Sequence, residues 1–358
     1  MDLPKTVHGG QAWRLDDVED YSHNLNPFGP PDDIGSIIAS AVSDIGHYPD
    51  DTCSELKDAI SKTFYVDTDC ITIGAGSSDI IRNFPNTFVE PGEKVLLCRP
   101  SFAEYAQQCR IAGAEIVWED LKPENDFRID TDSFLEKAKG CKAAYICNPN
   151  NPTGRVESRD KIIDIVRACE EMGVLVFLDE TLLELVPGYM DITLSGIVGR
   201  FSNLVIASSL TKSFAIPGIR IGFGFANSDL ISSMEKTRMT WNVGQIEQVV
   251  ATVLIRDRMD YVDHAAEVMA VESEIMNSSL SEIEFPVGQI SDSFFYFCDV
   301  SSLGMDAGTF KKKMLGEKIM VRDCSSFGSE YSGYVRFSVK DRERNCRFIA
   351  AVDSVINR

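Results

Sequence analysis

The sequence predicts an α/β protein with two domains, a large α/β/α sandwich around a mostly parallel sheet and a smaller α+β domain. The chain has 358 residues, which is more than one small core needs. From about residue 70, short apolar runs alternate with amphipathic stretches, the pattern of a parallel sheet covered by helices. After about Trp241 this alternation gives way to a long helical stretch and then to short strands.

The expected strands of the large domain are apolar runs separated by helical patterns. Residues Lys161–Met172, for example, place Ile162, Ile165, Val166 and Ala168 at helical spacing. The seven expected strands are Cys70–Ile73, Lys94–Cys98, Glu115–Trp118, Ala143–Cys147, Val174–Leu178, Asn203–Ala207 and Ile219–Ala226.

The smaller domain is expected from the C-terminal third of the chain. A long helical stretch at about Val243–Met276 precedes three expected strands, in SDSFFYFCDV, Ile319–Arg322 and YVRFSV. Residues 1–45 are irregular and rich in Pro, Gly and Asn, so we expect them to cover a site. The predicted large domain is therefore 46–245, and the smaller one combines 246–358 with part of 1–45.

Composition excludes several classes of protein. A net charge of -20 argues against a nucleic-acid partner, because phosphate binding needs clustered Lys and Arg. No apolar run approaches the roughly 20 residues of a membrane span, and MDLPKTVHGG has no signal-peptide core. The ten cysteines form no CxxC pair, which favours reduced thiols in a cytoplasmic protein. With four His and no ligand spacing, we expect no metal site.

The chemistry is expected at strand ends, because ligands of parallel α/β sheets bind beyond the carboxyl ends of the strands. The run ITIGAGSSDI leads a strand into Gly74, Gly76, Ser77 and Ser78 before a helix begins. Small residues at a helix N-terminus let backbone N–H groups approach a phosphate, and the hydroxyls add donors. The alternative is an ordinary strand–turn–helix with a serine cap.

Two further strand ends carry polar groups. In AAYICNPNNPTG, Asn151 can donate a side-chain hydrogen bond into the cleft, or the segment is simply a rigid polar turn. In VLVFLDE, Asp179 follows five apolar residues, where a carboxylate is costly to desolvate unless it is paired. The cationic ring nitrogen of a cofactor is a suitable partner. The alternative is a solvated acid or a helix cap, and Glu180 is the better candidate for a cap.

The segment ASSLTKSFAIPGIRIGFGFA is the most informative. Lys212 is flanked on both sides by small, hydroxyl-bearing or apolar residues, with no acid nearby. Burial and a neighbouring cation such as Arg220 lower the pKa of a lysine, which an amine needs in order to attack a carbonyl at neutral pH. Ser209, Thr211 and Arg220 can bind a phosphate. The alternative is a lysine whose amine lies at the surface.

Together these motifs resemble the fold type I pyridoxal phosphate enzymes, in particular the histidinol-phosphate aminotransferase-like branch. The likeness rests on GxGSS, PNNPTG, an Asp that ends an apolar strand, and S-x-T-K followed by R-x-G-F, in this order. It extends from Asn24 to Arg336. The resemblance implies a fold type I architecture, pyridoxal 5'-phosphate as cofactor, and a homodimer.

The resemblance also implies a role for each site residue. Lys212 forms the Schiff base and later moves protons, and Asp179 holds the pyridinium N–H. Asn151 bonds to the ring oxygen, and Phe102, in RPSFAEY, stacks on the ring. Arg336, in YVRFSV, binds the substrate carboxylate. The implied partners of the cofactor phosphate are Gly76, Ser77, Ser78, Ser209, Thr211, Arg220 and, from the neighbouring subunit, Tyr48 in HYPD.

One position departs from that family. Its members usually carry an aromatic residue, often Tyr, three residues after the ring-nitrogen Asp, and this chain has Leu182 there. The hydrogen bond to the ring oxygen then rests on Asn151 alone, which argues against efficient transamination.

The N-terminus resembles one group within the branch, the L-threonine-O-3-phosphate decarboxylases of cobalamin biosynthesis. Members typically begin with HGG, here His8–Gly10, and continue with Ser-x-Asn-x-Asn-Pro-x-Gly-Pro, here within Tyr21–Pro31. Leu25 stands where the aminotransferases of the branch more often have an acid, and Trp241-Asn242-Val243 is similar to a Trp-Ser-Val segment of the group. The residues expected to bind a small phosphorylated amino acid are His8, Asn24, Asn26, Arg322 and Arg336.

This resemblance implies decarboxylation of L-threonine O-3-phosphate to (R)-1-aminopropan-2-yl phosphate. His8 can instead be a disordered terminal residue, and Asn26 can form a simple Asn-Pro turn. The nearest rival function is an aminotransferase for histidinol phosphate or an aromatic amino acid. A non-catalytic ligand-binding module is the rival from another class, and the joint presence of Lys212, Asp179, Asn151 and Arg220 argues against it.

Overall fold

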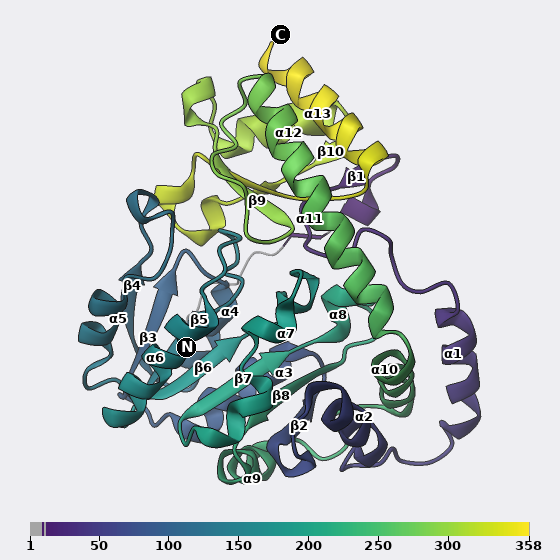
Figure 1. Ribbon diagram of the computed structural model, residues 1–358, viewed down its shortest axis with the longest axis vertical. Coiled ribbons are helices and arrows are strands. Elements are labelled where there is room, and N and C mark those ends of the chain that lie inside the picture. Colours follow the sequence, from purple (N-terminus) through teal and green to yellow (C-terminus); the bar gives the residue numbers. More distant parts are fainter. Residues whose placement is uncertain (1–8, 11, 358) are drawn as a thin grey trace.

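The computed structural model describes residues 9–10 and 12–357, and its large domain is built on a seven-stranded sheet (Figure 1). The strand order is β2-β8-β7-β6-β5-β3-β4. β8 is antiparallel to both of its neighbours, and every other adjacent pair is parallel, as the sequence predicts for a mostly parallel sheet. The strands are β2 Ile71–Gly74, β3 Lys94–Arg99, β4 Glu115–Asp120, β5 Ala143–Cys147, β6 Leu175–Asp179, β7 Leu204–Ser208 and β8 Gly222–Ala226.

Both faces of this sheet are buried, which explains why its central strands are apolar throughout. In β6, Val176 and Leu178 join one hydrophobic core, whereas Phe177 joins a second core on the opposite face. Successive side chains of a strand point to opposite faces, so a strand covered on both sides needs an uninterrupted apolar run.

Helices cover both faces of the sheet (Figure 1). Helices α3 Ser77–Phe88, α4 Ala103–Ile111 and α9 Ser228–Thr237 contribute to the core that contains Phe177. The other core receives α1 Ile34–Ala41, α2 Ser54–Phe64, α5 Thr131–Ala138, α6 Arg159–Glu171, α7 Tyr189–Ile192, α8 Leu210–Ser213 and α10 Gln245–Asp257.

The small domain has its own core and two short sheets. An antiparallel sheet has the order β11-β12-β9, and a parallel pair joins β1 to β10. The N-terminal segment thus enters the small domain through β1, as predicted. The elements are β1 Glu19–Asp20, α11 Met259–Glu282, β9 Phe295–Asp299, α12 Ala307–Gly316, β10 Ile319–Met320, β11 Arg322–Asp323, β12 Tyr334–Ser338 and α13 Arg342–Ile356.

Three details of the prediction need correction. The expected helical stretch from Val243 to Met276 is two helices, because the backbone leaves helical geometry at Arg258 (φ -139°, ψ 16°). The expected strand Ile319–Arg322 is two strands in different sheets. The domain boundary also moves beyond residue 245.

The revised boundary lies within α11, which runs from the large domain into the small one (Figure 1). Val262 and Met269 join the core of the large domain, whereas Met276 and Leu280 join the core of the small domain. The described part of residues 1–45 is also less irregular than predicted, because it contains the helix α1, whose Ile37 is buried in the large core.

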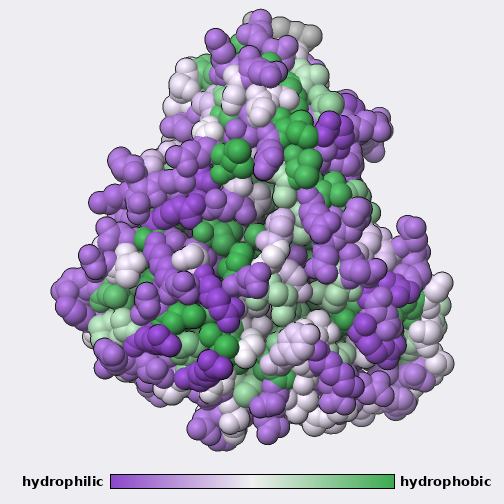
Figure 2. Space-filling model, in the orientation of Figure 1, coloured by the Kyte–Doolittle hydropathy of each residue, from purple (hydrophilic) through white to green (hydrophobic). Residues whose placement is uncertain are grey.

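Most of the visible surface is hydrophilic, with apolar residues scattered between polar ones (Figure 2). All ten cysteines are unpaired, as the sequence predicts. Among the described residues, no helix has the length and apolar character that crossing a membrane demands.

Candidate active site

One pocket collects most of the predicted site residues. Its volume is about 300 Å³, and its walls come from strand ends of the large sheet, from the N-terminal segment and from the small domain. This is the strand-end location expected for an α/β sheet. The predicted residues that line it are Asn24, Ser77, Ser78, Phe102, Asn151, Asp179, Ser209, Thr211, Lys212, Arg220, Arg322 and Arg336.

One end of the pocket carries hydroxyl groups and a guanidinium group. Ser77 and Ser78 begin α3, and Arg220 Nη2 donates to Ser78 Oγ at 3.1 Å. Gly76 has a φ of +84°, and a Cβ there would lie 2.5 Å from Arg220 Nη2, so glycine makes this approach feasible. Gly76 itself supports the pocket without lining it.

Ser209 and Thr211 complete this end from the turn after β7. Ser209 is the N-cap of the short helix α8, and its Oγ accepts from Thr211 N at 3.1 Å. The Ser209 hydroxyl also donates to the Ile221 carbonyl at 3.0 Å, which joins this turn to the segment that carries Arg220. Helix N-termini, hydroxyls and an arginine together form a site for a phosphate group.

Lys212 occupies the middle of the pocket. Burial, followed by the charges of Arg336 and Arg220, lowers the pKa of the amine to about 8, and Asp179 acts in the opposite direction. Two cations, Arg220 and Arg336, therefore act on this amine, which is partly accessible. An amine with this pKa is partly neutral at physiological pH and can attack a carbonyl.

Asp179 ends β6 and is only 4% exposed. Tyr105 Oη donates to its Oδ2 at 2.6 Å, and Thr181 donates to Oδ1 through its N–H at 2.9 Å and through its hydroxyl. Burial raises the pKa of Asp179, whereas these hydrogen bonds and the charge of Lys212 lower it. The carboxylate is thus prepared for one further cationic or donating partner.

The other end of the pocket contains two arginines. Arg336 and Arg322 are register partners on β12 and β11. Arg336 is 6% exposed, donates to Asn151 Oδ1 through Nη1, and donates to the Ser22 carbonyl through Nη2 at 2.6 Å. No ion pair joins Arg336 to a carboxylate of the described residues, although the charge of Asp20 acts to raise its pKa. A buried guanidinium without an ion-paired carboxylate favours an anionic ligand.

Three buried polar atoms at this end also find no hydrogen-bond partner within the described part of the chain. They are Arg336 Nε, His23 Nδ1 and Asn24 Oδ1. Buried polar groups are normally satisfied, so unsatisfied ones that converge on a pocket indicate a ligand site.

Two predicted residues lie away from the pocket, and a third is outside the described residues. Asn26 donates to the Ser213 carbonyl at 2.8 Å, and its Oδ1 accepts from Phe28 N, so it fixes a turn and its predicted contact with substrate is not supported. Tyr48 is 73% exposed and stacks on Trp241, with ring centroids 4.4 Å apart. Its predicted role across a subunit interface stays a prediction, as does that of His8, which falls among the residues not described.

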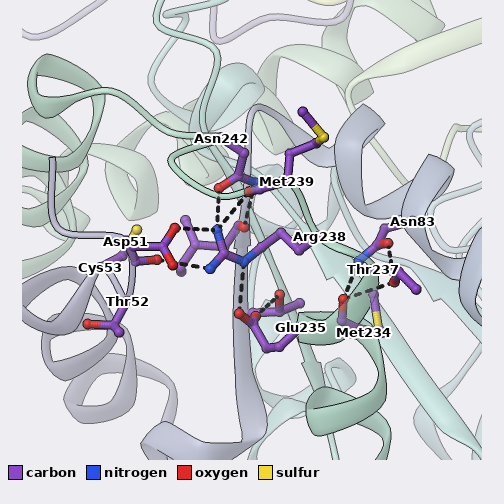
Figure 3. A network of polar contacts seen from close by, with 12 residues as sticks. Asp51, Thr52, Cys53, Asn83, Met234, Glu235, Thr237, Arg238, Met239 and Asn242 are labelled. Carbon is purple, nitrogen blue, oxygen red and sulfur yellow. Dashed lines mark hydrogen bonds and ion pairs between the residues drawn. The ribbon is translucent and has the colours of Figure 1, made fainter. Parts of the chain in front are cut away.

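A polar network fixes the segment that follows Tyr48 (Figure 3). Arg238 donates to Asp51, to Glu235 and to Asn242, and Trp241 N donates to Asp51 Oδ1 at 2.7 Å. Asn242 in turn donates to Asp79 Oδ2 at 2.8 Å. Because Asp79 belongs to the first turn of α3, the network connects the Tyr48 segment to the phosphate end of the pocket.

Sequence reasoning missed several lining residues. Tyr105 and His23 line the pocket and belong to segments from which other residues were predicted, Tyr105 to RPSFAEY and His23 to YSHNLNPFG. The same segments could therefore have indicated these two residues. Ser326 and Phe327 come from a loop of the small domain that shows no motif, and Ser326 Oγ accepts from Arg322 Nη2 at 2.7 Å.

The chain matches a known protein family over most of its length. The model of the aminotransferase class I and II family matches residues 17–352. The chain belongs to this family. Its members depend on pyridoxal phosphate and are typically homodimers, and the fold is the fold type I architecture that the sequence predicts.

Individual relatives of this chain differ in the activities that their names give. A putative threonine-phosphate decarboxylase of Caldanaerobacter subterraneus is 31% identical, over 92% of this chain and 88% of that protein. A histidinol-phosphate aminotransferase of Methanococcus maripaludis is 27% identical, over 93% and 88%.

Solved structures give the same picture. The histidinol-phosphate aminotransferase from Clostridium acetobutylicum has a TM-score of 0.87 at 28% identity, over 94% of this chain and 99% of that one. The L-threonine-O-3-phosphate decarboxylase from Porphyromonas gingivalis has a TM-score of 0.83 at 22% identity, over 95% and 100%, which supports the fold alone.

The residues of the pocket fit pyridoxal phosphate. The close approach of Arg220 to Gly76 and Ser78 prepares the phosphate end, and Asp179 offers a buried carboxylate to a ring nitrogen. Lys212 lies between the two charged ends with a lowered pKa. Leu182 lines the pocket and has no polar group to offer the ring oxygen, so the departure seen in the sequence is also present in the site.

Proposed function

We propose that the enzyme is a carboxy-lyase that converts L-threonine O-3-phosphate to (R)-1-aminopropan-2-yl phosphate, the step that its resemblance assigns to cobalamin biosynthesis. The observation that carries the proposal is the pair Arg322 and Arg336 at the substrate end. Two adjacent guanidinium groups match a small substrate with two anionic groups, a carboxylate and a phosphate.

The cofactor supplies an electron sink for the bond that breaks at the substrate α-carbon. Asp179 keeps the ring nitrogen protonated from the far side of the pocket, which sustains that sink. Lys212 carries the cofactor and, once displaced by the substrate amine, has a neutral amine that can move a proton at the α-carbon.

Orientation of the substrate would decide the reaction, because the cofactor would activate only one of the bonds at the α-carbon. Arg336 is held by Asn151 and by the Ser22 carbonyl, so its guanidinium group presents a fixed direction. In this proposal Arg336 would hold the carboxylate, and Arg322 would hold the phosphate with help from His23 and Asn24. Lys212 then returns a proton after carbon dioxide leaves.

The 31% identity to a putative threonine-phosphate decarboxylase supports this assignment. The second candidate is a histidinol-phosphate aminotransferase, because several such proteins match this chain over most of its length at 25–30% identity. Leu182 supports the first candidate, because the hydroxyl that the aminotransferases of the branch usually place at that position is missing.

Two incubations separate the candidates. The holoenzyme is mixed with threonine phosphate, or with histidinol phosphate and 2-oxoglutarate. Release of carbon dioxide from the first mixture without consumption of a keto acid is the expected result. Formation of glutamate in the second mixture, at a higher kcat/KM than carbon dioxide release in the first, overturns the proposal.

We also propose that the enzyme acts as a homodimer in which Tyr48 reaches the cofactor phosphate of the partner subunit. Its 73% exposure in the single chain and its stacking on Trp241, whose N–H donates to Asp51, support this role. Sedimentation gives the oligomeric state, and Tyr48→Phe weakens cofactor binding if the contact exists.

A further inference from the structure

The strand-end acid of this enzyme is surrounded by an unusual set of donors. Asp179 is buried, and the titratable groups that face it are Tyr105 on α4, Cys147 at the end of β5 and Lys212 on α8. Of these, Lys212 is the cation, and its effect on Asp179 is smaller than those of the hydrogen bonds. Burial acts most strongly and raises the pKa of Asp179, and the hydrogen bonds and the charge of Lys212 offset part of this effect.

These hydrogen bonds engage both oxygens of the carboxylate. Oδ2 accepts from Tyr105 Oη at 2.6 Å, and Oδ1 accepts both the N–H and the hydroxyl of Thr181. An ionised carboxylate offers about four lone-pair positions, so these donors occupy three of them. One acceptor position stays available, and Asp179, Tyr105 and Thr181 all line the pocket.

We propose that Tyr105 and Thr181 are positioning residues that keep the Asp179 carboxylate ionised and aim its remaining acceptor position at the cofactor ring nitrogen. Tyr105 is suited to this because its own position is fixed. Its ring is buried among Phe102, Tyr145 and Phe177, with centroid separations of 5.6, 5.5 and 6.4 Å. This packing fixes the position of the Tyr105 oxygen, from which the hydroxyl donates to Asp179 while it also interacts with the Cys147 thiol.

The proposal does not depend on whether the enzyme decarboxylates or transaminates its substrate. Either reaction needs a protonated ring nitrogen. Without the Tyr105 hydroxyl, the pKa of Asp179 rises. The proton shared between the carboxylate and the ring nitrogen then lies more on the carboxylate. The ring then withdraws less charge from its bond to Lys212.

The test uses the full-length protein and two readouts other than turnover. Cofactor affinity is measured by titrating pyridoxal phosphate into cofactor-free protein, and the absorption of the bound cofactor is followed against pH. We expect Tyr105→Phe to weaken affinity about tenfold, the size of one hydrogen bond to a charged group. We also expect the absorption change of the bound cofactor to move to higher pH.

Tyr145→Phe is the matched control. It removes a hydroxyl from the same aromatic cluster, but that hydroxyl forms no hydrogen bond with Asp179 or with any other described residue. Thr181→Val and Thr181→Ser form a second pair, because only the serine keeps the hydroxyl on Oδ1. We expect Tyr145→Phe and Thr181→Ser to behave like the parent protein, and Thr181→Val to shift both readouts in the same direction as Tyr105→Phe.

Two results overturn the proposal. One is a Tyr105→Phe protein whose cofactor affinity and absorption profile match those of the parent protein while Asp179→Asn changes both. The other is an equal change in Tyr105→Phe and Tyr145→Phe, which means that only packing is lost. If Tyr105→Phe fails to fold, the comparison of Thr181→Val with Thr181→Ser tests the proposal. Equal cofactor affinities and absorption profiles in these two variants count against it.

Discussion

The two ends of the pocket differ in how the chain builds them. The phosphate end comes from two turns at neighbouring strand ends, residues 74–79 and 208–220, and Arg220 and Ser78 there are exposed. The substrate end brings together the N-terminal segment, the NPNNP turn and two strands of the small domain, and it buries Arg336.

This difference shows how a general cofactor site and a particular substrate site can share one cavity. The exposed phosphate end relies on backbone turns and short hydroxyls, with little desolvation of charge. The buried substrate end keeps a guanidinium group among neutral partners, which is costly until an anion arrives. We therefore expect substitutions at the substrate end to have larger effects on catalysis than those at the phosphate end.

The largest effect is expected at the point where the two ends meet. Lys212→Ala removes the amine that carries the cofactor and moves protons, so turnover falls by at least about a thousandfold. Exposed Lys236 on α9 provides the control, because Lys236→Ala removes an equal charge far from the pocket. Steady-state kinetics and the melting temperature are measured together. More than a tenth of parent activity in Lys212→Ala contradicts the assignment.

Arg336→Lys tests the substrate end. A lysine keeps the charge but loses the planar fork that bonds to Asn151, to the Ser22 carbonyl and to the substrate carboxylate. We expect kcat/KM to fall about a hundredfold, with cofactor affinity unchanged within about twofold. A large loss of cofactor affinity with an unchanged KM contradicts the division of the pocket into two ends.

Arg220→Lys is the matching change at the phosphate end. Because this guanidinium is exposed and shares the phosphate with several hydroxyls, we expect affinity for pyridoxal phosphate to fall only about tenfold. Affinity for pyridoxal, which lacks the phosphate, stays the same. Equal losses for both compounds mean that Arg220 acts on the folded structure instead.

The smallest effect is expected on the pH dependence of cofactor reconstitution, where Arg336 at the substrate end changes the pKa of Lys212. The pKa of Lys212 is lowered to about 8, and only the neutral amine condenses with the cofactor aldehyde, so the rate of reconstitution rises with pH up to about 8 and then levels off. Arg336→Met removes a positive charge that lowers this pKa. The inflection then moves to higher pH, and the rate at pH 7 falls about threefold. An inflection that stays in place or moves to lower pH shows that Arg336 does not act on the amine.

The central strands show how far the sequence predicts the fold. Ala143–Cys147 is recovered residue for residue, because an apolar run between turn signals marks a strand buried on both faces. The small domain is predicted less well. Ile319–Arg322 has the pattern of one strand, and its division between two sheets depends on pairing with residues 19–20 and 335–336, which are remote in the sequence.

Prediction of the functional site from the sequence meets the same limit. Ser77, Asp179, Lys212 and Arg220 could be found because each lies at or near one end of a strand, in a segment whose local pattern is distinctive. Asn26 is in a motif too, but its hydrogen bond runs to the carbonyl of Ser213, a contact that no local pattern predicts.

By itself, the sequence determined the order of strands and helices, the turns that follow each strand, and the amine and acid that those turns carry. These features depend on interactions between residues close together in the chain. Only the tertiary structure decided that Tyr105 donates to Asp179, that Arg336 meets Asn151, and that α11 belongs to both domains. Such contacts join elements far apart in sequence, and their geometry follows from how the two cores pack.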